Sequence, residues 1–243
     1  MRWLRTYVIS PPVSAFCFAC FWTQGLVTSW FDANPTRALD VGPFWCWLLL
    51  KTAGVRIRTE GLDKISKQDF YVLVSNHLSL SDPPLLIAYL PGRIRFLFKD
   101  SLMKMPIIGA HLRRSGHIGV SREDARGAAR SLLDAARSIE SKEASILIFA
   151  EGTRGSGEDI QSFRGGAAHL AIKTGATVIP MGLWGTPDAL PKGAFFLRPG
   201  RIGLVIGDPM PTAGLTAKDR TQFTEALQLQ VEALRNRAME LTQ

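Results

Sequence analysis

A chain of 243 residues is long enough for one domain with a sizeable core, or for one domain and a membrane anchor. Its formal net charge of +8 at pH 7 suits nucleic acid, an anionic membrane or an acidic partner. The sequence has no zinc-ligand spacing, aromatic RNA-binding box or basic helix with heptads, so nucleic acid is disfavoured. The odd set of Cys17, Cys20 and Cys46 lies in the first fifth of the chain, and we interpret it as apolar residues in a reducing compartment.

The N-terminal segment is predicted to anchor the protein in a membrane. Residues 6–31 carry no formal charge, and a stretch of that length can span a bilayer. Pro11-Pro12 interrupts the pattern, which leaves residues 13–31 as the best helix, either spanning the bilayer or only dipping into it. A second apolar run, 41–50, is too short to span and is expected to lie at the interface or to pack on the protein. Most of the tryptophans fall in this region, as an interfacial hairpin requires, and the apolar stretch is too long for a signal peptide.

After Gly54, short strands alternate with helices. Strands are predicted at 55–59, 70–74, 94–98, 118–120, 144–150, 178–183 and 202–206. Helices are predicted at 83–89, at 101–113 with an interruption at Pro106, after a cap at Ser121, at 165–173, and along an apolar stripe over 223–241. This order predicts an α/β fold with a mixed, largely parallel sheet flanked by helices. We divide the chain into an N-terminal membrane-associated helical pair, residues 1–53, and an α/β domain, residues 54–243.

The first candidate site follows the apolar strand at 70–74. His77 and Asp82 lie in one loop between that strand and the next helix, which is where catalytic groups tend to sit. An imidazole with a carboxylate in reach is the usual equipment of a general base. The alternative is structural: Asp82 followed by Pro83 is an ordinary helix start, and His77 would then be a half-buried residue at a strand end.

The second candidate site, Glu151-Gly152-Thr153-Arg154, follows the apolar strand at 144–150. A guanidinium fixed after a Gly-Thr turn suits phosphate binding, although Arg154 could instead pair with Glu151 to hold the loop. Lys99 follows a strand and could stabilise an oxyanion or a phosphate. Arg122 stands before a helix N-terminus, a favourable position for an anion. Each of these two cations could equally be an ordinary solvated side chain.

Other candidates have weaker support. His111, His117 and His169 have no acidic residue close by in sequence, so we interpret them as surface or satisfied buried histidines. A covalent acyl-enzyme lacks an obvious nucleophile, because the soluble part has no cysteine and no Gly-x-Ser-x-Gly elbow. Ser79 and Ser81, near His77, keep that mechanism open. No His-rich or carboxylate cluster predicts a metal site.

Four boxes, in order, resemble motifs of the glycerolipid acyltransferases, and most closely the 1-acyl-glycerol-3-phosphate acyltransferase family. They are His77 to Asp82 with Asn76 before it, segments 99–109 and 116–122, the box at 151–154, and segment 178–181. The resemblance covers roughly residues 44–210, and Phe163-Arg164-Gly165-Gly166 also looks like the family's Phe-Lys-x-Gly turn, expected to shape the backbone. The chain departs from the family pattern at Ser101, Ser121, Ala150 and Gly155. These departures leave the chemistry intact and bear on the lipid acceptor.

The resemblance implies an enzyme at the cytoplasmic face of a membrane, expected to be a bacterial inner membrane. It implies transfer of a fatty acyl group from acyl-CoA or acyl carrier protein to the sn-2 hydroxyl of 1-acyl-glycerol-3-phosphate, giving phosphatidic acid without a dissociable cofactor. His77 would be the catalytic base, oriented by Asp82. Lys99, Arg122, Glu151, Gly152, Thr153 and Arg154 would bind substrate. The rivals are an acyltransferase for another lysolipid such as a lyso-ornithine lipid, a lipid hydrolase, and a non-catalytic membrane-binding module.

Overall fold

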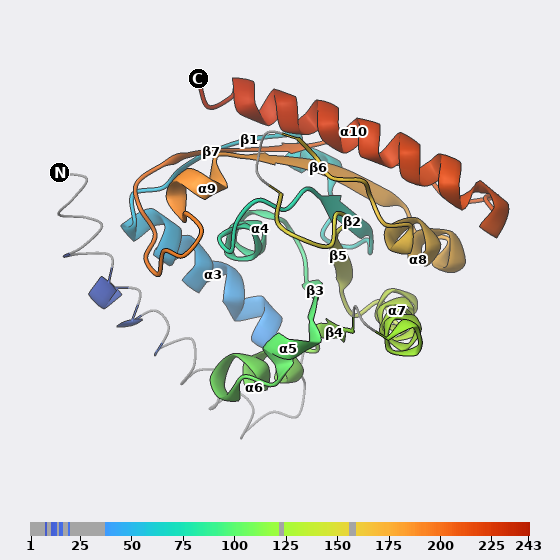
Figure 1. Cartoon of the computed structure of the whole chain (residues 1–243), viewed down its shortest axis with the longest axis horizontal. Coiled ribbons are helices and arrows are strands. Elements are labelled where there is room, and N and C mark those ends of the chain that lie inside the picture. The colour runs from blue at the N-terminus through green and yellow to red at the C-terminus, as the bar shows by residue number, and fades with distance from the viewer. Residues whose placement is uncertain are drawn as a thin grey trace.

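The computed structural model describes residues 37–121, 124–155 and 159–243, with a few isolated positions before residue 37. Its centre is a sheet with the strand order β1-β7-β6-β2-β5-β3-β4 (Figure 1). The strands are β1 (Arg56–Glu60), β2 (Val72–Ser75), β3 (Ile94–Lys99), β4 (Ile118–Val120), β5 (Ser145–Phe149), β6 (Val178–Trp184) and β7 (Arg201–Ile206). Neighbouring strands run parallel except β6 and β7. The predicted mixed, largely parallel sheet is therefore confirmed, and each predicted strand is present with small shifts at its ends.

Helices cover both faces of the sheet (Figure 1). They are α3 (Arg37–Thr52), α4 (Asp82–Tyr89), α5 (Asp100–Met103), α6 (Pro106–Arg114), α7 (Ala125–Glu140), α8 (Gly166–Thr174), α9 (Thr186–Ala189) and α10 (Arg220–Glu240), with single 3-10 turns η2 (Leu62–Lys64) and η3 (Ala217–Asp219). α3 and α4 pack on one face, and α7, α8 and α10 pack on the other. The predicted helix at 101–113 is interrupted as expected, and α6 begins at Pro106.

Successive side chains of the central strands point to opposite faces of the sheet, so an apolar core lies on each face. On β5, Leu147 faces the core under α3 and α4, whereas Ile146 and Ile148 face the core under α7 and α8. α10 lies especially close to the sheet, because a Cβ at Gly182 or Gly203 would collide with its backbone. Glycine is therefore required where the helix crosses β6 and β7.

The predicted apolar run 41–50 forms part of α3, which packs against α4. Leu50 and Ala53 at the end of this segment are buried in the core of the α/β fold. The predicted helix at 13–31 falls mostly outside the described residues. Among the described residues, no helix is both long enough and apolar enough to cross a bilayer.

The helix after β4 begins differently from the prediction. Asp124, rather than Ser121, is the N-cap of α7, and its carboxylate accepts hydrogen bonds from the N–H groups of Arg126 and Gly127. Ser121 supports this cap from outside, since its Oγ accepts from the Asp124 N–H at 3.3 Å.

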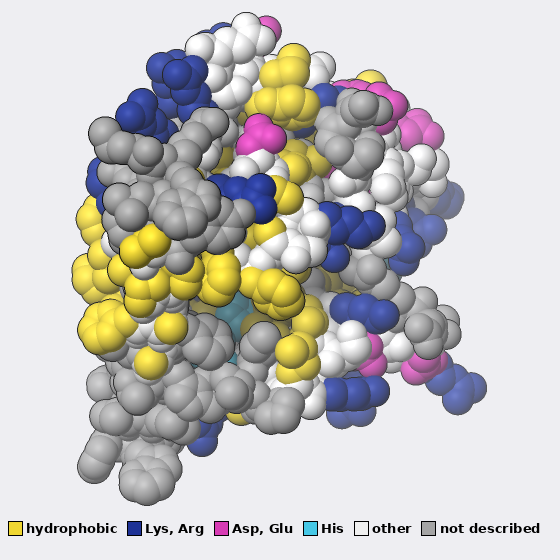
Figure 2. All heavy atoms as spheres, turned by 60° about the vertical axis from the view of Figure 1, so that its left-hand side comes forward, with side chains coloured by type: hydrophobic (Ala, Val, Ile, Leu, Met, Phe, Trp, Pro, Cys, Tyr) yellow, Lys and Arg dark blue, Asp and Glu magenta, His cyan; other side chains and the backbone are white. Residues whose placement is uncertain are grey.

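The connections between strands reverse direction between β2 and β5. From β2 the chain passes through α4 to β3, whereas from β5 it passes through α8 to β6 on the other side of β2. In open α/β sheets, ligands bind at the carboxyl ends of strands at such a switch point. Both candidate boxes follow these two strands. β6 runs from α8 toward α9, so its carboxyl end lies toward the left of Figure 1. Figure 2 brings that side of the molecule forward and shows hydrophobic side chains with Lys and Arg side chains near them.

Candidate active site

His77 and Asp82 form a close pair just beyond the end of β2. His77 Nδ1 lies 2.7 Å from Asp82 Oδ2, and the Asp82 side chain is fully buried while the imidazole is partly exposed. The same Oδ2 atom also accepts the N–H groups of Leu78 at 2.7 Å and Ser79 at 2.9 Å. The two backbone N–H donors on this oxygen match an ionised carboxylate, and a carboxylate 2.7 Å from Nδ1 favours the tautomer with the proton on Nδ1, which leaves Nε2 as the basic nitrogen.

Asp82 does not cap its helix. It is the first residue of α4, and the cap position is Ser81, whose side chain makes no capping hydrogen bond. The Asp82 carboxylate instead turns back to the loop that carries His77. The alternative in which Asp82 serves as an N-cap is therefore wrong, and its carboxylate is available to orient the imidazole.

Glu151 joins the two boxes, although they are far apart in sequence. Its Oε1 accepts the His77 N–H at 2.8 Å, and its Oε2 accepts the Gln161 N–H at 3.0 Å. The His77 carbonyl in turn accepts the Gly155 N–H at 2.8 Å. The residue at 77 is thus held on both sides of its peptide backbone by the loop after β5. Glu151 acts on the site by fixing the position of His77.

The charge of Glu151 is under opposing influences. Burial raises the pKa of the Glu151 carboxyl above its usual value, while the backbone N–H groups of Gln161 and His77 work in the opposite direction. Both oxygens accept backbone hydrogen bonds, so no ion pair with Arg154 is needed to hold the loop. Both residues are described, and no such pair joins them in the structure.

An aromatic ring forms one wall of the site. Phe149, the last residue of β5, stacks on His77 with ring centroids 4.1 Å apart and an interplanar angle of 17°. Phe149 also lines a pocket of about 410 Å³, a size within the range of small-molecule sites. Most of its lining is apolar and comes from the carboxyl ends of the strands and from α7, including Leu97, Val120, Leu132 and Ile148. His77 does not itself line the pocket, and Phe149 is the residue that borders both.

The predicted cations stand at this same edge of the sheet. Lys99 is the last residue of β3 and is exposed, and Arg154 is exposed in the loop after β5. Thr153 helps to shape that loop, since its Oγ1 donates to Gln161 Oε1 at 2.9 Å. Arg122 lies outside the described residues, so its predicted role as an anion-binding residue stays a prediction.

Gly152 has a structural reason to be glycine. Its φ of 74° is the left-handed conformation, and a Cβ there would meet Nε of Arg164 at 2.9 Å. Arg164 thus lies over the Glu151 loop and lines the pocket, in addition to the backbone role expected for its turn. Sequence reasoning did not place Arg164, Phe149 or Gln161 at the site, because nothing in their local patterns marks a contact with a distant loop.

The serines beside His77 serve the structure. Ser79 Oγ donates to the Leu190 carbonyl at 2.8 Å, and Ser81 Oγ contacts Ser79 Oγ at 3.1 Å. Both side chains are buried. Each hydroxyl is already engaged in packing the loop against α9, so neither is presented as a nucleophile.

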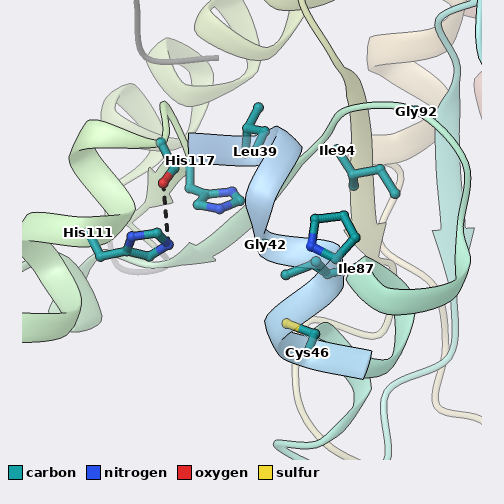
Figure 3. Close-up of a pocket in the computed structure, with 10 residues that line it drawn as sticks. Leu39, Gly42, Cys46, Ile87, Gly92, Ile94, His111 and His117 are labelled. Atoms are coloured by element: carbon teal, nitrogen blue, oxygen red, sulfur yellow. Dashed lines mark hydrogen bonds between the residues drawn. The ribbon is translucent and has the colours of Figure 1, made fainter. Parts of the chain in front are cut away.

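Two further histidines surround a second, much smaller cavity under α3 (Figure 3). His117 is buried and its Nδ1 accepts the Phe96 N–H at 3.1 Å, while His111 lies 3.3 Å from Ser115 Oγ. The cavity volume of about 30 Å³ is room for water rather than for a substrate. These contacts support the interpretation of both as satisfied histidines. Within the described part of the chain, no three His, Cys, Asp or Glu side chains gather as metal ligands do.

Comparison with known proteins places this geometry in a family. A model of the acyltransferase family matches residues 56–184. The 1-acyl-sn-glycerol-3-phosphate acyltransferase of Borreliella burgdorferi is 32% identical over 144 residues, covering 59% of this chain and 57% of its own length. The chloroplastic 1-acyl-sn-glycerol-3-phosphate acyltransferase LPAT1 of Arabidopsis thaliana is 33% identical over 182 residues, covering 74% and 48%. The chain thus spans less than two thirds of the length of these relatives.

A solved structure has the same fold. The 1-acyl-sn-glycerophosphate (LPA) acyltransferase PlsC of Thermotoga maritima superposes with a TM-score of 0.79 at 23% identity, covering 99% of this chain and 98% of that one. The family match extends over more than half of the present sequence and includes both candidate boxes. This chain is therefore a member of the acyltransferase family.

Proposed function

We propose that this protein transfers a fatty acyl group from an acyl thioester to the free sn-2 hydroxyl of 1-acyl-glycerol-3-phosphate, giving phosphatidic acid. The observation that carries the proposal is the His77–Asp82 pair, 2.7 Å apart, at the switch point of the sheet, where Phe149 stacks on His77 and also lines an apolar pocket. The relatives are named 1-acyl-sn-glycerol-3-phosphate acyltransferases, which supports this choice of acceptor.

Proton transfer is the task of His77. Its Nε2 removes the hydroxyl proton as that oxygen attacks the thioester carbonyl carbon, and Asp82 stabilises the imidazolium that forms. When the tetrahedral intermediate collapses, the carbon–sulfur bond breaks and the departing thiolate takes the proton from Nε2. The imidazole is then neutral again, so the cycle needs no added acid or base.

Phosphate recognition is the task of the cations around the site. Arg154 and Lys99 are exposed at the edge where His77 lies, and a guanidinium can bind phosphate through two parallel hydrogen bonds. Arg122 is the third member of this set by sequence, and one of these cations, or a backbone amide, would stabilise the oxyanion. The box Glu151 to Arg154 therefore has two functions: Glu151 positions the base, and Arg154 holds the acceptor.

The apolar pocket beside Phe149 receives an acyl chain in this proposal. Its lining of aliphatic side chains suits a hydrocarbon, which gains free energy by leaving water. The donor is acyl-CoA or acyl carrier protein, both acidic, which the net charge of +8 favours. We also propose that residues 1–53 hold the enzyme on the cytoplasmic face of a bacterial inner membrane, where the lysolipid is found.

The test uses the purified full chain in detergent with a panel of lysolipids and isotope-labelled acyl donors. We expect labelled phosphatidic acid from 1-acyl-glycerol-3-phosphate, and a loss of at least about a hundredfold in turnover for His77→Ala, the usual scale for a lost general base. His169→Ala is the matched control, because that histidine is exposed on α8.

Each rival predicts a different product. A preference for a phosphate-free acceptor such as a lyso-ornithine lipid would replace the proposed substrate. Release of free fatty acid without any acceptor would indicate a hydrolase. Turnover by His77→Ala equal to that of His169→Ala would remove His77 from the mechanism.

A further inference from the structure

Two adjacent aromatic side chains project from the connection between α9 and β7. Phe195 is 92% exposed and Phe196 is 40% exposed. We refer to residues 191–198 as the Phe195 loop. Phenylalanine is seldom left this open to water, and no other large apolar side chain among those described as exposed reaches the exposure of Phe195.

The base of the Phe195 loop is held firmly while its tip is open. The Arg198 N–H donates to the Ala189 carbonyl at 2.8 Å, which closes the two ends of the loop together. Leu197 is buried in the core, so the chain is fixed directly after the two phenylalanines. The exposure of Phe195 and Phe196 is thus imposed by a well-anchored backbone.

The Phe195 loop stands at the active-site edge of the sheet. It follows β6, whose carboxyl end lies beside that of β2 because the two strands run parallel. The Leu190 carbonyl, directly before the loop, accepts the hydroxyl of Ser79 from the segment that carries His77. Leu80 in that segment is itself 57% exposed.

Cationic side chains stand in the Phe195 loop and at the starts of two strands on the same edge of the sheet. Lys192 and Arg198 flank the phenylalanines in the loop. Arg56 and Arg201 start the adjacent strands β1 and β7 in register with one another, and the Arg201 guanidinium donates to the carbonyls of Thr242 and Gln243. These four side chains are exposed, and Asp188 on α9 is the exposed acid nearest in sequence. Two apolar rings flanked by the cations Lys192 and Arg198 fit a surface that is anionic outside and apolar within.

We propose that Phe195 and Phe196 insert into the headgroup region of an anionic phospholipid surface, with Lys192 and Arg198 against the lipid phosphates. This interface belongs to the α/β domain and is separate from residues 1–53. It rests on the proposed function in one respect: a lysolipid acceptor lies in that same surface and would enter the site from it. The hydrogen bond from Ser79 to Leu190 makes the inserted loop continuous with the segment that carries the base.

An acidic protein such as acyl carrier protein is the competing occupant. It would match the cations, but a protein docking surface needs apolar side chains set in a broad, complementary patch. Phe195 and Phe196 instead form a small projecting tip, which suits penetration into a soft interface.

The experiment measures binding of the full chain to vesicles of phosphatidylcholine with and without phosphatidylglycerol. The double variant Phe195→Ser/Phe196→Ser should lower the partition coefficient by at least about tenfold, the scale for withdrawing one buried phenyl ring from an apolar environment. Lys192→Gln and Arg198→Gln should each lower it roughly fivefold, and only where phosphatidylglycerol is present. Leu229→Ser is the matched control, because Leu229 is 67% exposed on α10, on the far face of the fold.

Several outcomes would overturn the proposal. They are an unchanged partition coefficient for the double variant, an equal loss for Leu229→Ser, or a loss of affinity for acyl carrier protein with vesicle binding intact. The single variant Phe195→Ser gives the same answer if the double variant does not fold. Vesicle binding needs no turnover, so failure of the proposed acyl transfer and failure of this interface are seen in different assays.

Discussion

Replacing Asp82 by asparagine tests how the site is built. Asp82 Oδ2 accepts from His77 Nδ1 and from the N–H groups of Leu78 and Ser79. The other oxygen, Oδ1, is buried and has no hydrogen-bond partner. An asparagine must direct its carbonyl oxygen at the three donors, which places its NH₂ group at the Oδ1 position with no acceptor.

The magnitudes follow from this arrangement. A hydrogen bond to a charged acceptor contributes about 1.5–3 kcal/mol and one to a neutral acceptor about 0.5–1.5, so each of the two backbone bonds loses roughly 1 kcal/mol. A buried unpaired NH₂ group costs roughly 1–3 kcal/mol more. Relief of the buried carboxylate's desolvation offsets part of this, and we expect a net destabilisation of about 1–3 kcal/mol. The kinetic effect is larger, because the imidazolium loses its counter-charge: the equivalent change in a serine-protease triad costs roughly ten-thousandfold.

The assay combines thermal melting with steady-state kinetics on 1-acyl-glycerol-3-phosphate. Asp82→Asn should melt several degrees below wild type and lose at least about a hundredfold in kcat, with KM little changed. Asp188→Asn, an exposed carboxylate in the first turn of α9, is the control and should match wild type in both. If Asp82→Asn is stable and nearly fully active, two conclusions are refuted: that the hydrogen bonds accepted by Asp82 Oδ2 stabilise the loop, and that Asp82 orients His77.

Three further predictions address the phosphate, the loop and the pH dependence. Arg154→Ala should cost about 1.5–3 kcal/mol of acceptor binding, measured as KM, and an equal loss with a phosphate-free acceptor would contradict its role. Glu151→Gln must turn an NH₂ group toward one of two N–H donors, so it should lower both melting temperature and kcat, whereas an unchanged kcat would show that His77 is held without it. Burial lowers the pKa of His117 to about 3. The neutral His117 side chain therefore contributes its full stability above pH 6.5. Below that pH the free energy of unfolding falls by about 1.4 kcal/mol per pH unit, down to about pH 3. His117→Asn, whose Oδ1 can still accept the Phe96 N–H, should flatten that slope in acid titrations of unfolding; an unaltered slope would contradict a neutral buried His117.

Much of the fold could be predicted from the sequence, because periodicity is a local signal. The run before His77 and the run before Glu151 both read as buried strands, and both are central strands of the sheet. The interruption at Pro106 was equally visible, since proline removes a backbone donor and is favoured at a helix start. The spacing of His77 and Asp82 already predicted an imidazole next to a carboxylate, and the structure places them 2.7 Å apart.

The role of each residue around that pair was decided only by tertiary structure. The sequence supports two interpretations of Asp82, because an aspartate before proline caps helices as readily as it orients histidines. The direction of its carboxylate depends on how the loop folds back, and that direction excludes the cap. The hydrogen bond from the His77 N–H to Glu151 and the stacking of Phe149 on His77 join β2 to β5, two strands separated in sequence by β3, β4 and four helices. Such contacts depend on strand order and register, which no local pattern encodes. The same holds for Phe195 and Phe196, which look like core residues by composition and are exposed because the fixed backbone on either side turns them outward.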